Sequence, residues 1–360
     1  MNWAWCDGPE IDEEEFIDAA MRWHFTPSTG SKFWLDRVDG LHFDPSRDIK
    51  THADLALFPN VVNELRRAPV ADLVPRGYGS SPEIIGVYDS GGTTGEPKRV
   101  VLFKDWLERS LEWKSARMDD LGFPRGVNWL IVAPSGPHIF GRLMAELPRM
   151  RGGVPFMVDL DPRWVRKCIS EGRAEEANRY AEHVVDQAET ILRSQSVGVL
   201  VATPPLLERM AVREGLVAII NDTVEVIMWG GAHMDPDTRA LFQQDVFPGV
   251  KMVGQYGSTM ILGGSMERPR YADARTCVFD SFSPYTTFSV VSPETGAQVP
   301  AGQRGQVVMH HISKAVLLPN NLERDLATSV AAPGGALGVS VADVAPVPAF
   351  EDIPVIEGVY

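Results

Sequence analysis

The sequence predicts an α/β fold with a large, mainly parallel sheet covered by helices and a small antiparallel β subdomain. Between residues 81 and 275 apolar runs alternate with helical segments, whereas after about Cys277 short apolar runs are separated only by turn residues. The first pattern is typical of parallel sheets covered on both faces, and the second of antiparallel strands. With 360 residues, the chain is long enough for one large domain or two smaller ones.

The first 80 residues have few clean periodicities, and their aromatic, proline and charged residues favour short helices that wrap the core. In the α/β part, strands are expected at residues 84–88, 100–103, 127–132, 154–158, 197–201 and 224–229. Helices are expected at residues 139–150 and 175–193, and from Pro204 and Asp235 onward. The long helix at 175–193 has a continuous apolar face, and proline at position 204 suits a first helical turn.

Two antiparallel strands are expected at residues 288–291 and 305–309, with a turn at 293–296 after the first. Residues 333–360 are rich in Gly, Pro, Ala and Val without a clear period, so we expect a loosely packed tail. The expected division is a large domain over residues 1–325 and a short tail over 326–360. Within the domain, the wrapping helices occupy 1–80, the α/β core 81–275 and the β subdomain 276–325.

Composition narrows the classes of partner. The net charge of −14 argues against nucleic acid or an anionic membrane surface. Cys6, Cys168 and Cys277 are isolated and the histidines show no ligand spacing, so no disulfide framework or protein metal site is indicated. The N-terminus lacks the pattern of a signal peptide, and no apolar run approaches the ~18 residues of a spanning helix. A cytoplasmic protein without nucleic-acid or membrane partners is expected.

The most informative segment is Ser90-Gly91-Gly92-Thr93-Thr94-Gly95-Glu96-Pro97-Lys98, which lies between two expected strands. Its glycines let backbone N–H groups form a concave nest for anions, and its hydroxyls and lysine suit phosphate. An ordinary turn is the competing interpretation. A P-loop NTPase is disfavoured, because Glu96 and Pro97 separate Gly95 from the lysine and no helix follows the loop directly.

Residues 88–98 resemble the phosphate-binding motif of the adenylate-forming superfamily, which comprises acyl-CoA synthetases, luciferases and peptide-synthetase adenylation domains. Three further motifs follow in the family's order, at residues 229–232, 254–260 and 321–326. The resemblance covers roughly residues 80–330. It is closest to the phenylacetate-CoA-ligase-like branch, and especially to the short adenylation proteins of phenazine-antibiotic biosynthesis. It implies that residues 1–325 form the family's large N-terminal domain and that its small C-terminal domain is truncated.

The resemblance also implies ATP and Mg²⁺ as cofactors and assigns roles to particular residues. The triphosphate would be held by Ser90, Gly91, Gly92, Thr93, Thr94, Gly95 and Lys98. Adenine would be held by Gly230, Gly231, Ala232 and Tyr256, with Gly257 and Ser258 beside them, and the ribose by Asp325. Lys98 and Thr259, the latter at the α-phosphate, would be the catalytic residues. The acid would be bordered by His138, Met260, Gly263 and Gly264, although a lone histidine is more often a structural residue.

Three departures from the family pattern leave questions open. Met260 replaces a glutamate that helps to hold magnesium, and a thioether is a poor ligand for a hard cation. The triphosphate, waters, Thr94 or another carboxylate would then hold the metal. Arg324 replaces a glycine. The last lysine of the sequence is Lys314, so residues 326–360 cannot supply the family's usual catalytic lysine.

We therefore expect ATP-dependent activation of an aromatic carboxylic acid to an acyl-adenylate, with release of pyrophosphate, in secondary-metabolite biosynthesis. A downstream reductase, acyltransferase or carrier protein would receive the acyl group, and a homodimer is left open. One alternative is a degenerate protein that binds nucleotide or an aryl acid without turnover. Another is an acyl-CoA ligase. The sequence does not identify the acid.

Overall fold

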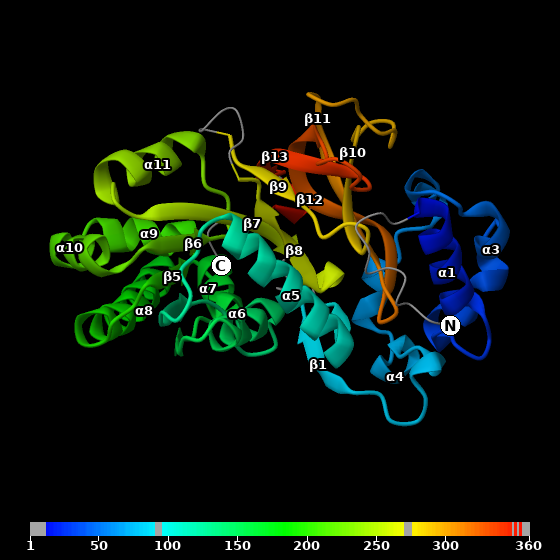
Figure 1. Cartoon of the computed structure of the whole chain (residues 1–360), viewed down its shortest axis with the longest axis horizontal. Coiled ribbons are helices and arrows are strands. Elements are labelled where there is room, and N and C mark those ends of the chain that lie inside the picture. The colour runs from blue at the N-terminus through cyan, green and yellow to red at the C-terminus, as the bar shows by residue number, and fades with distance from the viewer. Residues whose placement is uncertain (1–11, 91–95, 270–275, 348, 351–352, 355–360) are drawn as a thin grey trace.

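The computed structural model describes residues 12–90, 96–269, 276–347, 349–350 and 353–354. In this part of the chain, one eleven-stranded sheet runs through the molecule in the order β10-β11-β12-β13-β9-β8-β7-β6-β5-β3-β4. Strands β4, β3, β5, β6 and β7 are parallel, whereas pairings from β7 through β8, β9, β13, β12, β11 and β10 are antiparallel. The structure therefore confirms the predicted fold class and joins its two parts into a continuous sheet (Figure 1).

The strands of this sheet are β3 (Trp129–Val132), β4 (Pro155–Val158), β5 (Val199–Ala202), β6 (Val226–Trp229), β7 (Lys251–Ser258), β8 (Gly263–Glu267), β9 (Val278–Asp280), β10 (Thr286–Val291), β11 (Arg304–Ile312), β12 (Leu317–Ala331) and β13 (Val339–Pro346). Two separate hairpins are β1 (Ile84–Asp89) with β2 (Arg99–Phe103) and β14 (Ala349–Phe350) with β15 (Ile353–Pro354). The larger helices are α1 (Glu13–Phe25), α5 (Lys104–Asp120), α6 (Ile139–Met150), α7 (Pro162–Ser170), α8 (Ala174–Ser194), α9 (Pro204–Ala211), α10 (Glu214–Thr223) and α11 (Pro236–Leu241).

Helices cover both faces of the parallel strands because successive residues of a strand point to opposite faces. In β5, Val199 and Val201 belong to the apolar cluster that includes residues of α5 and α6. Leu200 and Ala202 belong to a second cluster with residues of α8, α9 and α10. All four side chains are buried. The uninterrupted apolar runs of these strands thus reflect a sheet buried on both sides.

The N-terminal helices lie at the end of the molecule opposite α8–α10 (Figure 1). Besides α1, these are the short segments α2 (Lys32–Leu35), α3 (Pro45–Asp48), α4 (Val70–Leu73) and four 3₁₀ turns at 38–40, 52–57, 62–66 and 76–78. Two indole N–H groups tie them to the β11–β12 connection: Trp23 donates to the carbonyl of Lys314 and Trp34 to that of Leu317, each at 2.9 Å. The segment therefore packs as part of the core.

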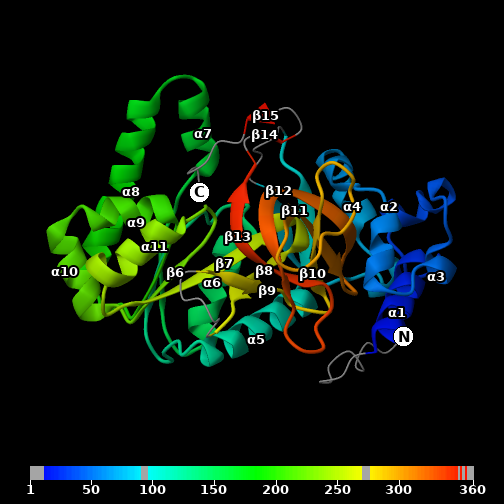
Figure 2. The ribbon, with the colours of Figure 1, turned by 90° about the horizontal axis from the view of Figure 1, so that it is seen from above.

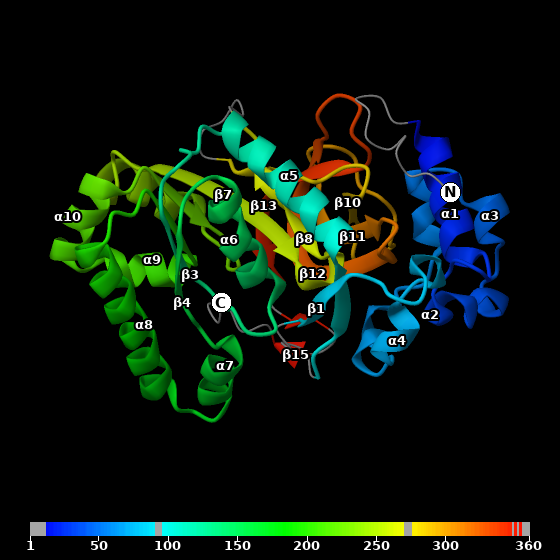
Figure 3. The ribbon, with the colours of Figure 1, turned by 60° about the horizontal axis from the view of Figure 1, so that its bottom comes forward.

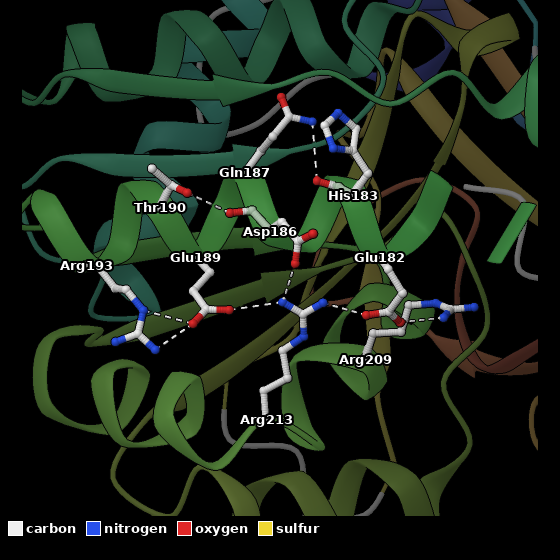
Figure 4. Close-up of polar contacts among 9 residues, drawn as sticks. All are labelled: Glu182, His183, Asp186, Gln187, Glu189, Thr190, Arg193, Arg209 and Arg213. Carbon is white, nitrogen blue, oxygen red and sulfur yellow. Dashed lines mark hydrogen bonds and ion pairs between the residues drawn. The ribbon is translucent and has the colours of Figure 1, made fainter. Parts of the chain in front are cut away.

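At the opposite end, α8 is tied to the α9–α10 corner by an ion-pair network (Figures 2 and 4). Arg213 lies between α9 and α10 and reaches Asp186 at 2.7 Å and Glu189 at 3.0 Å, and it also pairs with Glu182. Arg209 of α9 binds Glu182 at 2.8 Å. These carboxylates lie on one side of α8, so the network fixes how the helices of this face sit against one another.

For residues 339–346, the expectation of a loosely packed tail is wrong, because they form a paired strand. Residues 317–331 form β12, so the predicted boundary at 325/326 falls within a strand, and β13 pairs with both β12 and β9. Ser340, Val341 and Ala342 are buried there. Small residues enclosed on both sides give no alternation of polar and apolar positions, which explains why the strand has no sequence signature. No helix in the described ranges is long and apolar enough to cross a membrane.

Candidate active site

A cleft opens where the sheet changes from parallel to antiparallel. Residues 251–254 of β7 pair with β6 in parallel, and residues 255–258 pair with β8 in antiparallel register. Ligand crevices in α/β proteins lie beyond the carboxyl ends of parallel strands, and β7 reaches that end at this point. One group of lining residues comes from the β1–β2 hairpin, β6, β7 and β12: Ser90, Lys98, Gly230, Gly231, Gln255, Tyr256, Gly257, Ser258, Asn321, Leu322, Glu323, Arg324 and Asp325. The other comes from α5, α6 and the start of β8, with the residues before them: Lys114, Pro134, His138, Ile139, Phe140, Leu143, Met144, Thr259, Met260, Gly263 and Gly264.

The β1–β2 hairpin presents the glycine-rich loop to the cleft. Ser90 N–H donates to the carbonyl of Lys98 at 2.9 Å, and Lys98 N–H donates to Ser90 Oγ at 3.0 Å. These two bonds close the base of the loop and place Ser90 and Lys98 side by side on the cleft wall. The expected ligands Gly91, Gly92, Thr93, Thr94 and Gly95 lie outside the described residues. Arg66, which sequence reasoning did not single out, also lines the cleft and donates to the carbonyl of Glu96.

Tyr256 and Asp325 are joined across the cleft, although they are far apart in sequence. The Tyr256 hydroxyl donates to Asp325 Oδ2 at 2.9 Å. Burial, followed by the Asp325 charge, raises the pKa of Tyr256 well above its usual value, so the phenol keeps its proton. Asp325 lies in β12, whose next neighbour is β13: the register pairs Asp325 with Pro346. The segment expected to be a loose tail therefore helps to fix the aspartate.

Glu323 is a second carboxylate in the cleft, and sequence reasoning missed it. It lies two residues before Asp325 on β12, and both residues line the cleft, although the pairing of β12 with β11 is irregular between Leu322 and Leu326. Asn321 Nδ2 donates to Glu323 Oε1 at 2.7 Å. Burial first, then repulsion from Asp325, raises the pKa of Glu323, while a hydrogen bond from Ser258 and the charge of Lys98 act in the opposite direction. No local pattern marks Glu323, because the strand pairing is irregular between Leu322 and Leu326 and a regular alternation of faces does not apply there.

The glycines after β6 let the chain pass close to β7. A Cβ atom on Gly230 would lie 2.7 Å from the carbonyl oxygen of Gln255, and Gly231 has a φ of +80° that favours glycine. Ala232 follows them but is not part of the cleft lining. Two buried polar atoms at this wall, Gln255 Nε2 and Thr203 Oγ1, have no hydrogen-bond partner in the described part of the chain. A bound ligand with acceptor and donor atoms would satisfy them.

The wall formed by α6 and β8 is more apolar. His138 directly precedes α6, and burial, followed by the charge of Arg163, lowers its pKa. Met260 is 4% exposed, so its thioether forms part of the wall. A Cβ atom on Gly264 would lie 2.7 Å from the carbonyl oxygen of Tyr256, so glycine lets β8 pack closely against β7 here. Lys114, a buried residue of α5 that the sequence did not single out, lines the same end.

The structure thus brings together every predicted site residue that it describes except Ala232. Thr259 lies directly after β7, beside Ser258, at the point where the two groups of lining residues meet. Among the described residues, no cluster of three or more histidine, cysteine or acidic side chains could hold a metal ion.

The protein is of the α/β class, and its cleft lies where the pairing in the mixed sheet changes from parallel to antiparallel. A sequence model described as "AMP-binding enzyme" matches residues 85–315, which is more than half of the chain. The chain therefore belongs to the AMP-binding enzyme family, which confirms the resemblance seen in its motifs. None of the curated proteins matches the chain.

Solved structures of similar fold support the architecture. A 2-hydroxyisobutyryl-CoA ligase, in complex with 2-HIB-AMP and CoA, superposes with a TM-score of 0.64 at 16% identity, covering 91% of this chain and 66% of that one. The anthranilate-CoA ligase AuaEII, in complex with anthranoyl-AMP, gives a TM-score of 0.51 at 14% identity, covering 73% of this chain and 48% of that one. At these identities the likeness concerns the fold, and the chain spans about two thirds of the first protein's length.

Proposed function

We propose that the protein uses ATP to convert an aromatic carboxylic acid into its acyl-adenylate, releasing pyrophosphate. The observation that carries the proposal is the convergence on one cleft of Ser90 and Lys98, the Tyr256–Asp325 pair and an apolar wall that includes Met260. The first two elements suit a triphosphate and a nucleoside, and the third suits an apolar acid. Membership of the AMP-binding family supports the nucleotide assignment.

The nucleotide would lie along β6, β7 and β12. A flat base would lie against the backbone of Gly230 and Gly231, with the Tyr256 ring and the unpaired Gln255 Nε2 beside it. The Asp325 carboxylate can accept hydrogen bonds from vicinal ribose hydroxyls, and its bond to Tyr256 fixes its orientation. The hairpin loop and Lys98 would then hold the β- and γ-phosphates, with Thr259 at the α-phosphate.

The residues present fit magnesium only in combination with the phosphates. Mg²⁺ usually binds one or two carboxylates together with substrate phosphates. Glu323 offers such a carboxylate, with Ser258 and Lys98 close by, whereas Met260 offers only a thioether. We therefore propose Glu323 as the protein's magnesium ligand. When bound, the ion would neutralise phosphate charge during the reaction.

In the proposed reaction, a carboxylate oxygen of the acid attacks the α-phosphorus, and the bond from this phosphorus to the bridging oxygen of the β-phosphate breaks. Pyrophosphate leaves with the electron pair, and no proton moves. Catalysis then consists of alignment and charge stabilisation. Thr259, at the junction of the two walls, would orient the α-phosphate, and Lys98 would stabilise charge on the departing phosphates.

The aromatic class of the acid and a place in secondary metabolism remain parts of the proposal. The apolar wall, made by Phe140, Leu143, Met144 and Met260, supports an apolar aromatic acid. The adenylate would pass to a reductase, an acyltransferase or a carrier protein. A second candidate is a protein that binds the nucleotide without turnover, which the replacement of a metal-binding carboxylate by Met260 favours.

Pyrophosphate release with a panel of aromatic acids, compared between the wild type and Lys98→Ala, separates these candidates. We expect acid-dependent release that falls by about 10²–10³ in the variant, the typical cost of losing one oriented charge-stabilising group. Release at the no-acid background for every acid, combined with a thermal shift by ATP, would favour the binding protein. Neither release nor a shift by millimolar ATP and Mg²⁺ would refute both candidates.

A further inference from the structure

Lys114 is a buried cation at the acid end of the cleft. It lies on α5, and only 2% of its surface is exposed. Helix α5 packs against α6 and β8 (Figure 3), and residues of all three elements line the cleft around Lys114, including Leu143, Met144 and Gly264. The lysine therefore approaches the cleft from the apolar wall and not from the hairpin or β12.

The ammonium group of Lys114 has no polar partner in the described part of the chain. Neither a hydrogen bond nor an ion pair joins its Nζ to another described residue, and its one favourable contact there is the Trp113 ring, 5.7 Å from the ring centroid. Burial alone lowers its pKa to about 8. A charged amine in such a place is costly unless something pairs with it.

Among the described residues, the other buried lysine and arginine side chains have partners. Arg151 is equally buried, yet it donates to the carbonyl and the hydroxyl of Ser115, at 2.9 and 3.0 Å, and pairs with Asp119 at 3.0 Å. Arg239 pairs with Glu267. Lys114 differs from both because it lines the cleft, so a ligand can reach its amine. The missing partner is therefore expected in the ligand.

We propose that Lys114 binds an oxygen substituent of the acid, remote from the carboxylate that is activated, so that the preferred substrate is a hydroxy- or carboxy-substituted aromatic acid. This inference rests on the proposed function. The reacting carboxylate has to meet the α-phosphate near Thr259, whereas Lys114 enters between α6 and β8. A bound oxygen would supply the acceptor that the ammonium group lacks and would offset the cost of burying its charge.

Matched benzoic acids test the inference: benzoate and its methyl-, hydroxy- and carboxy-substituted forms at each ring position. Lys114→Met keeps the length of the side chain without the charge. Arg117→Met, which removes an exposed cation from the same helix, serves as the control. Pyrophosphate release gives kcat/KM for each acid, and calorimetry without ATP gives each Kd. Comparing the hydroxy- with the carboxy-substituted acids shows which substituent Lys114 prefers.

For the preferred oxygen-substituted acid, we expect Lys114→Met to lower kcat/KM and affinity by about 10- to 100-fold, the worth of a hydrogen bond to a charged group. The values for the methyl-substituted acid should stay within about 3-fold under the same reasoning, and Arg117→Met should change neither. An equal loss for all acids would overturn the inference, because Lys114 would then hold the reacting carboxylate. The inference would also be overturned if Lys114→Met kept the wild-type ratio of kcat/KM between the oxygen-substituted and the methyl-substituted acid.

The calorimetric arm separates this inference from the proposed function. If no acid releases pyrophosphate but the wild type still binds the oxygen-substituted acid more tightly than the methyl analogue, the proposed reaction fails and the role of Lys114 stands. If pyrophosphate is released while Lys114→Met keeps the wild-type preference, the reaction stands and the role of Lys114 fails. Absence of binding by every oxygen-substituted acid overturns the role as well.

Discussion

Replacing Lys114 with methionine should stabilise the ligand-free protein near neutral pH. Burial lowers the pKa of Lys114 from its ordinary 10.5 to about 8. Because each pKa unit corresponds to about 1.4 kcal/mol, holding the ammonium group charged in the folded state costs about 3 kcal/mol at pH 7. Methionine fills a similar volume without a charge, so most of this free energy should return as stability. A binding residue that costs stability is typical of functional sites.

The gain should depend on pH in a defined direction. Below pH 8 the lysine is protonated in both the folded and the unfolded state, so the penalty is constant. Between pH 8 and 10.5 the folded state loses the proton first, so the unfolded state binds more protons and wild-type stability rises with pH. The advantage of Lys114→Met should therefore shrink from about 3 kcal/mol at pH 7 to near zero at about pH 10.5.

Urea unfolding, followed by circular dichroism at pH 7 and pH 10, measures the difference. Arg117→Met is the control, because it removes an exposed charge from the same helix and should change the free energy of unfolding by less than about 1 kcal/mol. A Lys114→Met variant that is less stable than the wild type at pH 7, or an advantage that does not change with pH, would refute the reasoning. The first result would mean that the amine has a partner in the folded protein, and the second that the gain does not come from removing the charge.

Three further changes probe the nucleotide end and the distant surface. Asp325→Asn removes the charge that accepts the Tyr256 hydroxyl, so calorimetry should show ATP affinity lower by about 10- to 100-fold; an unchanged affinity would exclude a ribose role. Glu323→Gln should weaken Mn²⁺ binding to the ATP complex by at least about 10-fold, measured by electron paramagnetic resonance, without weakening metal-free ATP binding. If the variant bound Mn²⁺ as tightly as the wild type does, Glu323 would not be the metal ligand. Arg213→Gln should lower the free energy of unfolding by about 1 kcal/mol and leave pyrophosphate release unchanged, since its partners lie on α8 (Figure 4); a loss of activity would contradict that separation.

Much of the fold could be predicted from local sequence. The apolar runs at 127–132, 197–201 and 224–229 are strands buried on both faces, and proline marks the starts of α9 and α11. Helix α5 was not singled out, because its buried face carries Ser110, Lys114 and Ser115 among the apolar residues, which weakens the helical pattern. Strand β13 pairs with the preceding strand β12 and with β9, but its residues do not alternate between polar and apolar, so the local sequence does not mark it as a strand.

Part of the candidate site could also be predicted from local sequence, and part could not. Its glycine and hydroxyl clusters are local signals, and the structure brings Ser90, Lys98, Tyr256 and Asp325 onto one cleft. Lys114 has no such signal, because its position in the cleft arises only from the packing of α5 against α6 and β8. An isolated lysine in a sequence is usually a solvated charge. Only burial without a partner distinguishes this one.

The most direct test of acyl-adenylate formation uses an acid labelled with ¹⁸O in its carboxylate. The protein is incubated with ATP, Mg²⁺ and the labelled acid, and hydroxylamine then cleaves the product at its carbonyl carbon. If the carboxylate attacks the α-phosphorus, mass spectrometry should find one ¹⁸O atom in the AMP and the acyl group as hydroxamate. AMP without the label, or ADP as the sole nucleotide product, would contradict the account.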